Sequence, residues 1–299
     1  MNARPIFSRE ACTLCGTCVA DCPRRILAIV DQAVVLTEDA CLLCAHCYAV
    51  CPANAVAFDS DRLQAPTFRT FAPPEQVFDA QRIDATMLAG AALSRRSIRR
   101  FQDTPVSREA LADLVEFAAT APSGSNSRNW EFSVVSTAAG VAAVRARLVA
   151  FYRRLNRLAG NPIVRALSVP VTGKRLLDYH RLRRVRIEFM VRQADAGRDL
   201  FFWGAPALIV VHSGPDGSTP LEDAQYAAYN ITLLAHALGL GTCFIGYARE
   251  AVNRDARLKT LLGIPRRHKA HAVLAVGHPD VSYARLPLRK NFQVNWVEA

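Results

Sequence analysis

The sequence is organised around one cysteine-rich run, CTLCGTCVADCP at residues 12–23. The same pattern recurs as CLLCAHCYAVCP at residues 41–52. Both runs read C-x2-C-x2-C-x3-C-P, so eight of the nine cysteines belong to an internal duplication. Three thiolates at such short intervals can wrap one compact group, while the fourth cysteine of each run faces away from it.

This spacing resembles that of bacterial ferredoxins with two 4Fe–4S clusters, and the resemblance covers residues 1–60. In such a module the fourth cysteine of each run binds the cluster of the other run. Gly16 gives the backbone room to approach its cluster, and Pro23 and Pro52 redirect the chain after the fourth ligand. The predicted ligand sets are Cys12, Cys15, Cys18 and Cys51 for one cluster, and Cys41, Cys44, Cys47 and Cys22 for the other.

Disulfides and zinc sites fit the cysteine pattern less well. Disulfides form in exported proteins, and the segment Met1–Glu10 lacks the apolar stretch of a secretory signal. Zinc sites use paired C-x2-C units, not a triplet followed by C-P, and His46 is a poor substitute ligand in this pattern.

The composition is that of a soluble globular protein, with 299 residues of which 51% are hydrophobic and 21% charged. Residues 224–248 contain no Asp, Glu, Lys or Arg, but Asn230 and His236 interrupt them and Gly239 would end a helix. We therefore expect a buried helix and a turn there, with no membrane span. A cytoplasmic location is the expectation.

The excess positive charge is concentrated in one segment. The whole chain has a net charge of +11, and residues 145–192 alone hold thirteen Lys or Arg against Asp178 and Glu188. Residues 1–60 have a net charge of −2. Such a local excess is typical of a solvated helical face, or of a lid that steers an anionic substrate, so we expect no nucleic-acid partner.

Composition and hydrophobic patterning divide the chain into three parts. We expect the cluster domain at 1–60, a proline-containing linker at 61–86 and a second domain at 87–299, with a basic helical insertion at about 145–198 that is interrupted near Pro170 and Gly173. Helices are predicted from an N-cap at Ser107 and over 223–238, and strands over 131–137, 207–212 and 272–276. The interspersed elements predict an α+β fold.

Four short stretches of the second domain could bind a ligand. They are Arg95–Phe101, with four arginines and a serine, the small polar loop Ala121–Asn126, the glycine-rich segment Gly239–Gly246, and the basic tail that includes residues 285–290. Cationic donors beside a hydroxyl suit a phosphate. Taken singly, each stretch is more often a solvated face or a loop. The glycine segment follows a helix, so it does not match a dinucleotide fingerprint.

In this order and at these separations the stretches resemble the FMN-dependent nitroreductase family over about residues 87–299. The resemblance implies a central sheet flanked by helices, and a homodimer with two FMN sites at its interface. It implies that Arg95, Ser97 and Arg289 with Lys290 bind the FMN phosphate, with Arg96 in the same run. It also implies a cation at Arg99 beside the N1–C2 carbonyl edge of the flavin. The remaining implied FMN contacts are Ser123, Ser125, Asn126, Gly241, Thr242, Ile245 and Gly246.

The two halves together predict an oxidoreductase in which two 4Fe–4S clusters relay electrons to or from FMN. FMN would then reduce a small organic substrate, a nitro compound or another electrophilic or unsaturated molecule. The expected donor is a low-potential redox protein, such as a ferredoxin or a flavodoxin, because no nicotinamide fingerprint is present. Two alternatives stay open: an FMN-dependent dehydrogenase that exports electrons through the clusters, and a non-enzymatic electron carrier.

No side chain is nominated as an acid or base catalyst. Cys243, the ninth cysteine, is interpreted as a buried structural residue. Six histidines show no ligand spacing in the sequence and are also interpreted as structural: His180, His212, His236, His268, His271 and His278.

Overall fold

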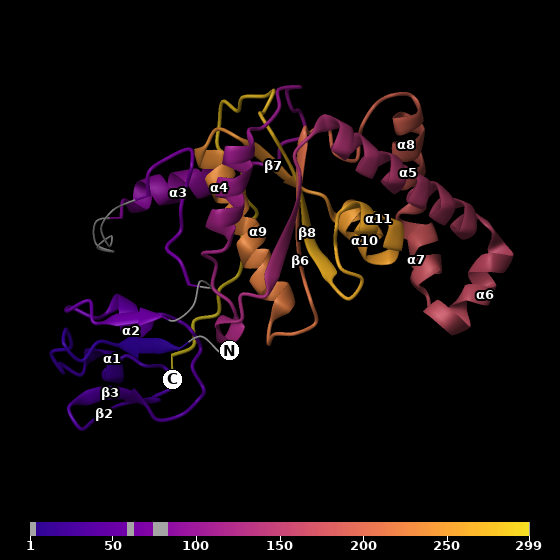
Figure 1. Cartoon of the computed structure of the whole chain (residues 1–299). Coiled ribbons are helices and arrows are strands. Elements are labelled where there is room, and N and C mark those ends of the chain that lie inside the picture. Colours follow the sequence, from indigo (N-terminus) through magenta and orange to yellow (C-terminus); the bar gives the residue numbers. More distant parts are fainter. Residues whose placement is uncertain (1–3, 59–62, 74–82, 299) are drawn as a thin grey trace.

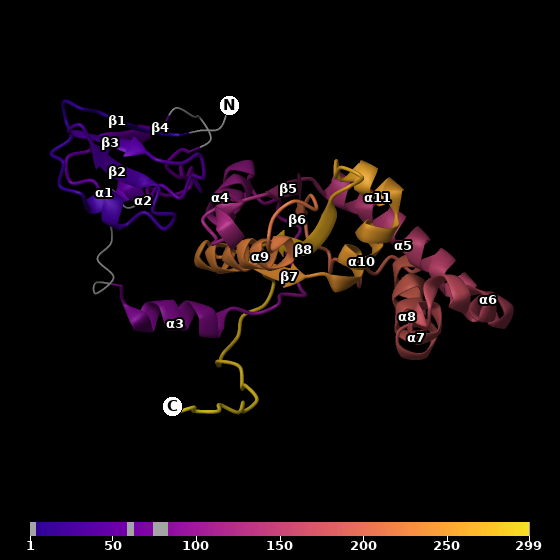
Figure 2. The same ribbon diagram turned by 90° about the horizontal axis from the view of Figure 1, so that it is seen from below.

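The computed structural model describes residues 4–58, 63–73 and 83–298. These residues form a small N-terminal domain, a larger layered domain and a helical arm (Figure 1). In both views the N-terminal domain and the arm lie on opposite sides of the larger domain (Figure 2).

The N-terminal domain consists of two short strand pairs and two single-turn helices. Its elements are β1 (Pro5–Phe7) paired with β4 (Val56–Phe58), β2 (Leu27–Val30) paired with β3 (Ala33–Leu36), α1 (Thr17–Ala20) and α2 (His46–Ala49). Both pairs are antiparallel. The apolar core is built on Cys18, Leu27 and Val34. A core this small needs bonds to a bound group to hold a domain together.

The larger domain is built on one antiparallel sheet. Its strands are β5 (Trp130–Val135), β6 (Ala207–Ser213), β7 (Gly241–Phe244) and β8 (Lys269–Gly277). They lie in the order β5-β6-β8-β7. Every residue of β6 is buried, which places this strand at the centre of the fold.

Helices cover both faces of the sheet. Alternate residues of β6 point to opposite faces: Ala207 and Ile209 join one apolar cluster, and Leu208 and Val210 join the other. The first cluster holds α4 (Arg108–Ala118) and α9 (Pro220–Ala237), and the second holds α5 (Ala138–Gly160), α10 (Gly246–Arg254) and α11 (Ala256–Leu261). No helix among the described residues combines the length and the apolarity needed to cross a membrane.

The structure confirms the predicted α+β fold with a central sheet flanked by helices. The helix expected after Ser107 is α4, and the Ser107 hydroxyl accepts a hydrogen bond from the Ala110 N–H at 3.1 Å. The helix expected over 223–238 is α9, and three expected strands are β5, β6 and β8. Strand β7 was not predicted, because its glycine-rich neighbourhood is typical of a turn.

The basic segment forms a helical arm, as its patterning predicted. The helices after α5 are α6 (Pro162–Thr172), α7 (Arg175–Leu182) and α8 (Arg184–Asp195). The predicted interruption near Pro170 and Gly173 is wrong for Pro170, because α6 continues through it, and it falls at Gly173, which ends α6 with a φ of 61°. Tyr179 anchors α7 by donating to Asn156 Oδ1 at 2.5 Å, so the arm has a packed base.

Part of the predicted linker is bound to the larger domain. Asp113 of α4 is fully buried, and its carboxylate accepts hydrogen bonds from the Arg69 N–H at 2.8 Å and from the Thr70 N–H and hydroxyl at 2.7 and 2.6 Å. Helix α3 (Ala85–Ser94) begins at its N-cap Asp84, and it starts inside the expected linker range. Residues 59–62 and 74–82 of that linker region lie outside the described residues.

Asp113→Asn is expected to lower the free energy of unfolding by about 2–3 kcal/mol at pH 7, because it weakens charge-assisted hydrogen bonds in a buried position. Burial opposes ionisation, but the hydrogen bonds from Thr70 and Arg69 outweigh it and hold the pKa of Asp113 below its ordinary value of 3.8. The stabilisation is therefore present above pH 3.8 and is lost as the pH falls through the lower folded-state pKa.

Denaturant unfolding followed by circular dichroism at several pH values measures this difference. Glu109→Gln, at an exposed position on the same helix, is the matched control. Equal stability of Asp113→Asn and the unmutated chain at pH 7 would contradict the anchoring role.

Candidate functional site

The structure gathers the eight duplicated cysteines into two groups of four. One cavity is lined by Cys12, Cys15, Cys18 and Cys51, and the other by Cys41, Cys44, Cys47 and Cys22. Each group takes its fourth member from the other run. The two groups have the same members as the two predicted ligand sets, whose binding of clusters stays a prediction.

The backbone around both groups follows the same path. Leu14 and Leu43, which occupy the same position in the two runs, have φ values of 55° and 52°. Gly16 and Ala45 also correspond, with φ values of 75° and 59°. A left-handed backbone costs a non-glycine residue about 1 kcal/mol or more, so its repetition indicates a demand from a bound group. It turns backbone N–H groups toward sulfur: Leu43 donates to Cys41 Sγ at 3.4 Å.

Burial opposes ionisation of one thiol in each group. Burial raises the pKa of Cys47 to about 11, and burial also raises the pKa of Cys18. Hydrogen bonds from Thr17 lower the pKa of the exposed Cys15. Four soft sulfur donors around a small cavity, with one thiol in each group whose pKa is raised by burial, fit an iron–sulfur cluster in each group.

The arginine-rich stretch lies along the sheet edge beside β7. The Ile98 N–H donates to the Thr242 carbonyl at 2.9 Å, and Ser97 forms an isolated bridge with Thr242. A Cβ atom on Gly241 would meet Ile98 Cγ1 at 2.6 Å, so the close approach requires glycine. The structure thus brings together Ser97, Gly241 and Thr242, which are far apart in the sequence.

A cavity of about 460 Å³ opens beside this stretch and contains three guanidinium groups, from Arg95, Arg96 and Arg285. No carboxylate is among its lining residues, all of which belong to the described part of the chain. Arg95 Nε is buried and has no hydrogen-bond partner. A guanidinium donor without a partner, in a cavity without carboxylates, fits a phosphate. A phosphate can accept two parallel hydrogen bonds from one arginine.

A second cavity, of about 650 Å³, continues along the same edge. Arg99, Ile245 and Gly246 line it, together with aromatic side chains such as Trp203. Helix α8 of the arm supplies part of its wall with Arg186, Phe189 and Met190. Cys243 also lines it and is only 3% exposed, and burial raises the pKa of its thiol, as for a structural cysteine.

The small polar loop lies elsewhere, against the N-terminal domain. It forms the 3₁₀ turn η2 (Gly124–Asn126), and its Gly124 N–H donates to the buried Asp223 Oδ1 at 2.9 Å. Asn126 Nδ2 donates to the carbonyls of both Leu42 and Leu43 at 2.9 Å. These carbonyls lie between Cys41 and Cys44, so a loop of the larger domain touches a cysteine loop of the smaller one.

The structure therefore divides the implied FMN residues among three places. Arg95 and Arg96 line the first cavity with Gly241 and Thr242, and Ser97 bridges to them. Arg99, Ile245 and Gly246 line the second cavity. Ser97 itself lines neither cavity, and the same holds for Ser123, Ser125 and Asn126 and for the exposed Arg289 and Lys290.

Sequence reasoning missed several lining residues. Arg285 belongs to the basic tail but was not nominated, and His236, whose Nε2 lies 2.7 Å from the Ser94 hydroxyl, was interpreted as structural. The charge excess predicts that the arm is basic, but nothing in its periodicity places Arg186 at a cavity wall.

Known proteins resemble the larger domain. A protein of Archaeoglobus fulgidus named as an NADH dehydrogenase/NAD(P)H nitroreductase is 27% identical over 192 residues, covering 62% of this chain and 82% of the relative. A crystal structure of an FMN and NADPH-dependent nitroreductase from Sphigopyxis sp. strain HMH is 26% identical, with a TM-score of 0.50, and covers 70% of this chain and 97% of its own.

A crystal structure of a nitroreductase with bound FMN from Bacteroides fragilis shares the fold, with a TM-score of 0.52 at 20% identity, and covers 71% of this chain and 98% of its own. The family model for the nitroreductase family matches residues 92–278, and the model for a 4Fe-4S dicluster domain matches residues 4–52. This chain belongs to the nitroreductase family, and a 4Fe–4S dicluster domain precedes its nitroreductase domain.

Proposed function

We propose that this protein is an FMN-dependent oxidoreductase in which two 4Fe–4S clusters relay electrons to FMN for the reduction of a small organic substrate. The substrate would be a nitro compound or another electrophilic or unsaturated molecule. Family membership, the two cysteine groups and the acid-free arginine cavity support the enzyme and its cofactors.

One observation supports the proposed electron relay between the clusters and FMN. Asn126 binds the backbone between Cys41 and Cys44 with two hydrogen bonds of 2.9 Å, and it lies in a loop that the family resemblance assigns to the flavin. An electron path needs the two redox groups to be close. A direct contact between a cluster loop and a flavin loop supports such a path, and it singles out the group that contains Cys41 and Cys44 as the one that exchanges electrons with FMN.

The arginines would bind and orient FMN. Arg95, Arg96 and Ser97 would hold the phosphate, because charge-assisted forked hydrogen bonds fix both position and orientation. Arg99 would lie at the carbonyl edge of the ring, where a cation stabilises negative charge. When bound, FMN accepts electrons one at a time and delivers two as a hydride equivalent from N5. The remaining proposed contacts are Ser123, Ser125, Asn126, Gly241, Thr242, Ile245, Gly246, Arg289 and Lys290.

The arm would shape the substrate side of the site. Arg186, Phe189 and Met190 of α8 face the same cavity as Arg99 and Trp203. An apolar and aromatic wall excludes water, and the guanidinium groups favour a planar substrate that carries partial or full negative charge. Nitro compounds have this character.

A homodimer would cover the exposed apolar tail. Leu288 is 99% exposed and Trp296 is 86% exposed, and Met87 on α3 is 72% exposed. Apolar side chains gathered on peripheral segments favour burial against a second copy. A second copy would also explain how Ser123 and Ser125, which line neither arginine cavity, could contact FMN.

Anaerobic purification with iron, sulfide and flavin quantified, followed by turnover with a model nitro compound, tests the proposal. We expect about eight iron atoms and one FMN per chain. Reduced ferredoxin or flavodoxin should drive turnover faster than NADPH. Iron without flavin would contradict the enzyme. NADPH-driven turnover with no response to ferredoxin would contradict the relay, and substrate-driven reduction of the clusters would reverse its direction.

A further inference from the structure

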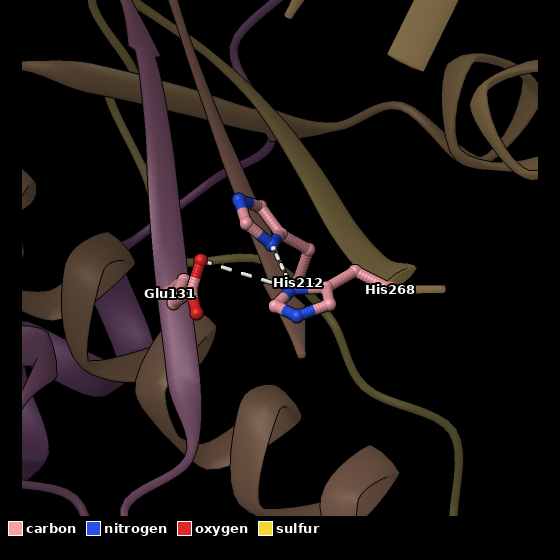
Figure 3. A group of neighbouring side chains, drawn as sticks. All are labelled: Glu131, His212 and His268. Carbon is pink, nitrogen blue, oxygen red and sulfur yellow. Dashed lines mark hydrogen bonds and ion pairs between the residues drawn. The ribbon is translucent and has the colours of Figure 1, made fainter. Parts of the chain in front are cut away.

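Three potential metal ligands meet at the end of the sheet that is remote from the arginine cavities. Glu131 lies in β5, His212 near the end of β6, and His268 immediately before β8 (Figure 3). Their nearest ligand atoms all lie within 4.8 Å of one another. The two histidines are 56 positions apart, so only the fold brings them together.

The sheet is locally adjusted at this point. Glu131 and His212 are direct cross-strand partners between β5 and β6. The pairing of β6 with β8 shifts its register between Val211 and His212. Such an irregularity redirects side chains and is frequent beside functional sites. It leaves His212 oriented so that its ring meets His268 across the strand end (Figure 3).

The distances suit a tetrahedral metal ion. His212 Nδ1 lies 3.1 Å from His268 Nδ1, and His268 Nδ1 lies 3.7 Å from Glu131 Oε2. Ligands about 2.0–2.1 Å from a tetrahedral zinc ion lie roughly 3.3 Å from one another. The observed separations fall on both sides of that value, so an ion fits between the three atoms with small side-chain movements.

A single proton cannot satisfy the lone pairs of all three ligand atoms. Each of the three atoms can present a lone pair toward the others. One proton on a ring nitrogen can satisfy one of the close approaches, and the third atom then faces a lone pair. A metal cation placed among the three atoms accepts a lone pair from each of them.

The surroundings resemble the outer shell of a metal site. His212 Nε2 lies 3.1 Å from the Ser133 hydroxyl, which fixes the ring and leaves Nδ1 for a ligand. The Lys259 ammonium donates to the His268 carbonyl at 2.5 Å, which holds the backbone of that ligand. The His212 residue is 2% exposed, whereas the Glu131 side chain is 57% exposed, so an ion could enter from the Glu131 side.

We propose that Glu131, His212 and His268 bind one zinc ion, with water in the fourth position. Nitrogen and oxygen donors in this number favour zinc over calcium or magnesium, which prefer oxygen alone. The site is separate from the redox centres, because its residues line neither arginine cavity nor either cysteine group. It would tie the ends of β5, β6 and β8 together.

The test is an anaerobic titration of the full chain, with its iron and sulfide in place, with zinc chloride. We expect one zinc per chain beyond the iron, and a melting temperature that rises with zinc. His268→Ala should weaken zinc binding by roughly 100-fold, and Glu131→Gln by about tenfold. His180→Ala, on α7, is the matched histidine control and should bind zinc as the unmutated chain does.

Zinc-edge X-ray absorption separates this site from adventitious binding to cysteine. Nitrogen and oxygen neighbours at about 2.0–2.1 Å support the proposal, whereas sulfur at about 2.3 Å overturns it. Binding of no zinc, or equal affinity in His268→Ala and the unmutated chain, also overturns it. Glu131→Gln lies at an exposed position, so it remains informative if His268→Ala folds poorly.

Discussion

Cys44→Ala is expected to lower ferredoxin-driven turnover by about 100-fold or more, because removal of a direct ligand costs at least as much as the 10–100-fold loss seen for outer-shell residues. Cys44 lines the cavity with Cys22, Cys41 and Cys47, and Asn126 contacts the backbone of the same loop. Turnover with dithionite, a small reductant that reaches the flavin directly, should persist. The ratio of the two rates therefore isolates the relay.

Two further variants make the result specific to the relay. Asn126→Ala removes both hydrogen bonds to the cluster loop without touching a cysteine, so it should slow ferredoxin-driven turnover more than dithionite-driven turnover while iron content stays constant. His46→Ala changes an exposed non-ligand side chain of the same run and is the control. Ferredoxin-driven rates in Cys44→Ala that equal those of the unmutated chain would show that electrons bypass this cluster.

Arg95→Ala is expected to weaken FMN binding by about 100-fold, which corresponds to about 2.7 kcal/mol for the loss of charge-assisted hydrogen bonds to a phosphate. Arg95 has a buried Nε without a partner, and its guanidinium lies 5.9 Å from the centre of the Tyr229 ring. The protein therefore already holds this group in place, and little ordering cost remains when a phosphate binds. Titration of flavin-free protein with FMN, followed by flavin fluorescence, gives the dissociation constant.

Arg95→Lys tests whether the geometry or the charge of this side chain contributes more to FMN binding. A lysine keeps the charge but cannot form paired hydrogen bonds, so it should recover only part of the affinity. Arg108→Ala removes an exposed arginine from α4 and should leave FMN affinity and iron content unchanged. An unaltered dissociation constant in Arg95→Ala would place the phosphate outside this cavity.

The cysteine groups could be predicted because their geometry is local. Spacing within each run determines which thiolates can reach one centre, and only Cys22 and Cys51 must cross to the other run. The strands β5, β6 and β8 were predictable from their apolar and β-branched runs. Strand β7 was not, because its pairing with β8 outweighs the weak strand preference of its glycine-rich surroundings.

Contacts between distant segments could not be predicted from the sequence. Asn126 has the character of a turn residue, and nothing in its neighbours predicts a bond to Leu42 and Leu43. His212 and His268 likewise lack a ligand spacing, since the shape of the sheet alone brings their ring nitrogens to 3.1 Å. The apolar pattern of the arm predicted helices, but which side of α8 reaches the second cavity depends on how the arm packs.

The exchange of Cys22 and Cys51 between the two groups also affects biogenesis. A nascent chain that ends before Cys47 can complete neither four-cysteine group, because one group still lacks Cys51 and the other still lacks Cys47. Assembly of either proposed cluster would then wait until most of the second repeat has been synthesised. Neither repeat would be a self-sufficient unit of maturation, since each supplies one cysteine to the group of the other.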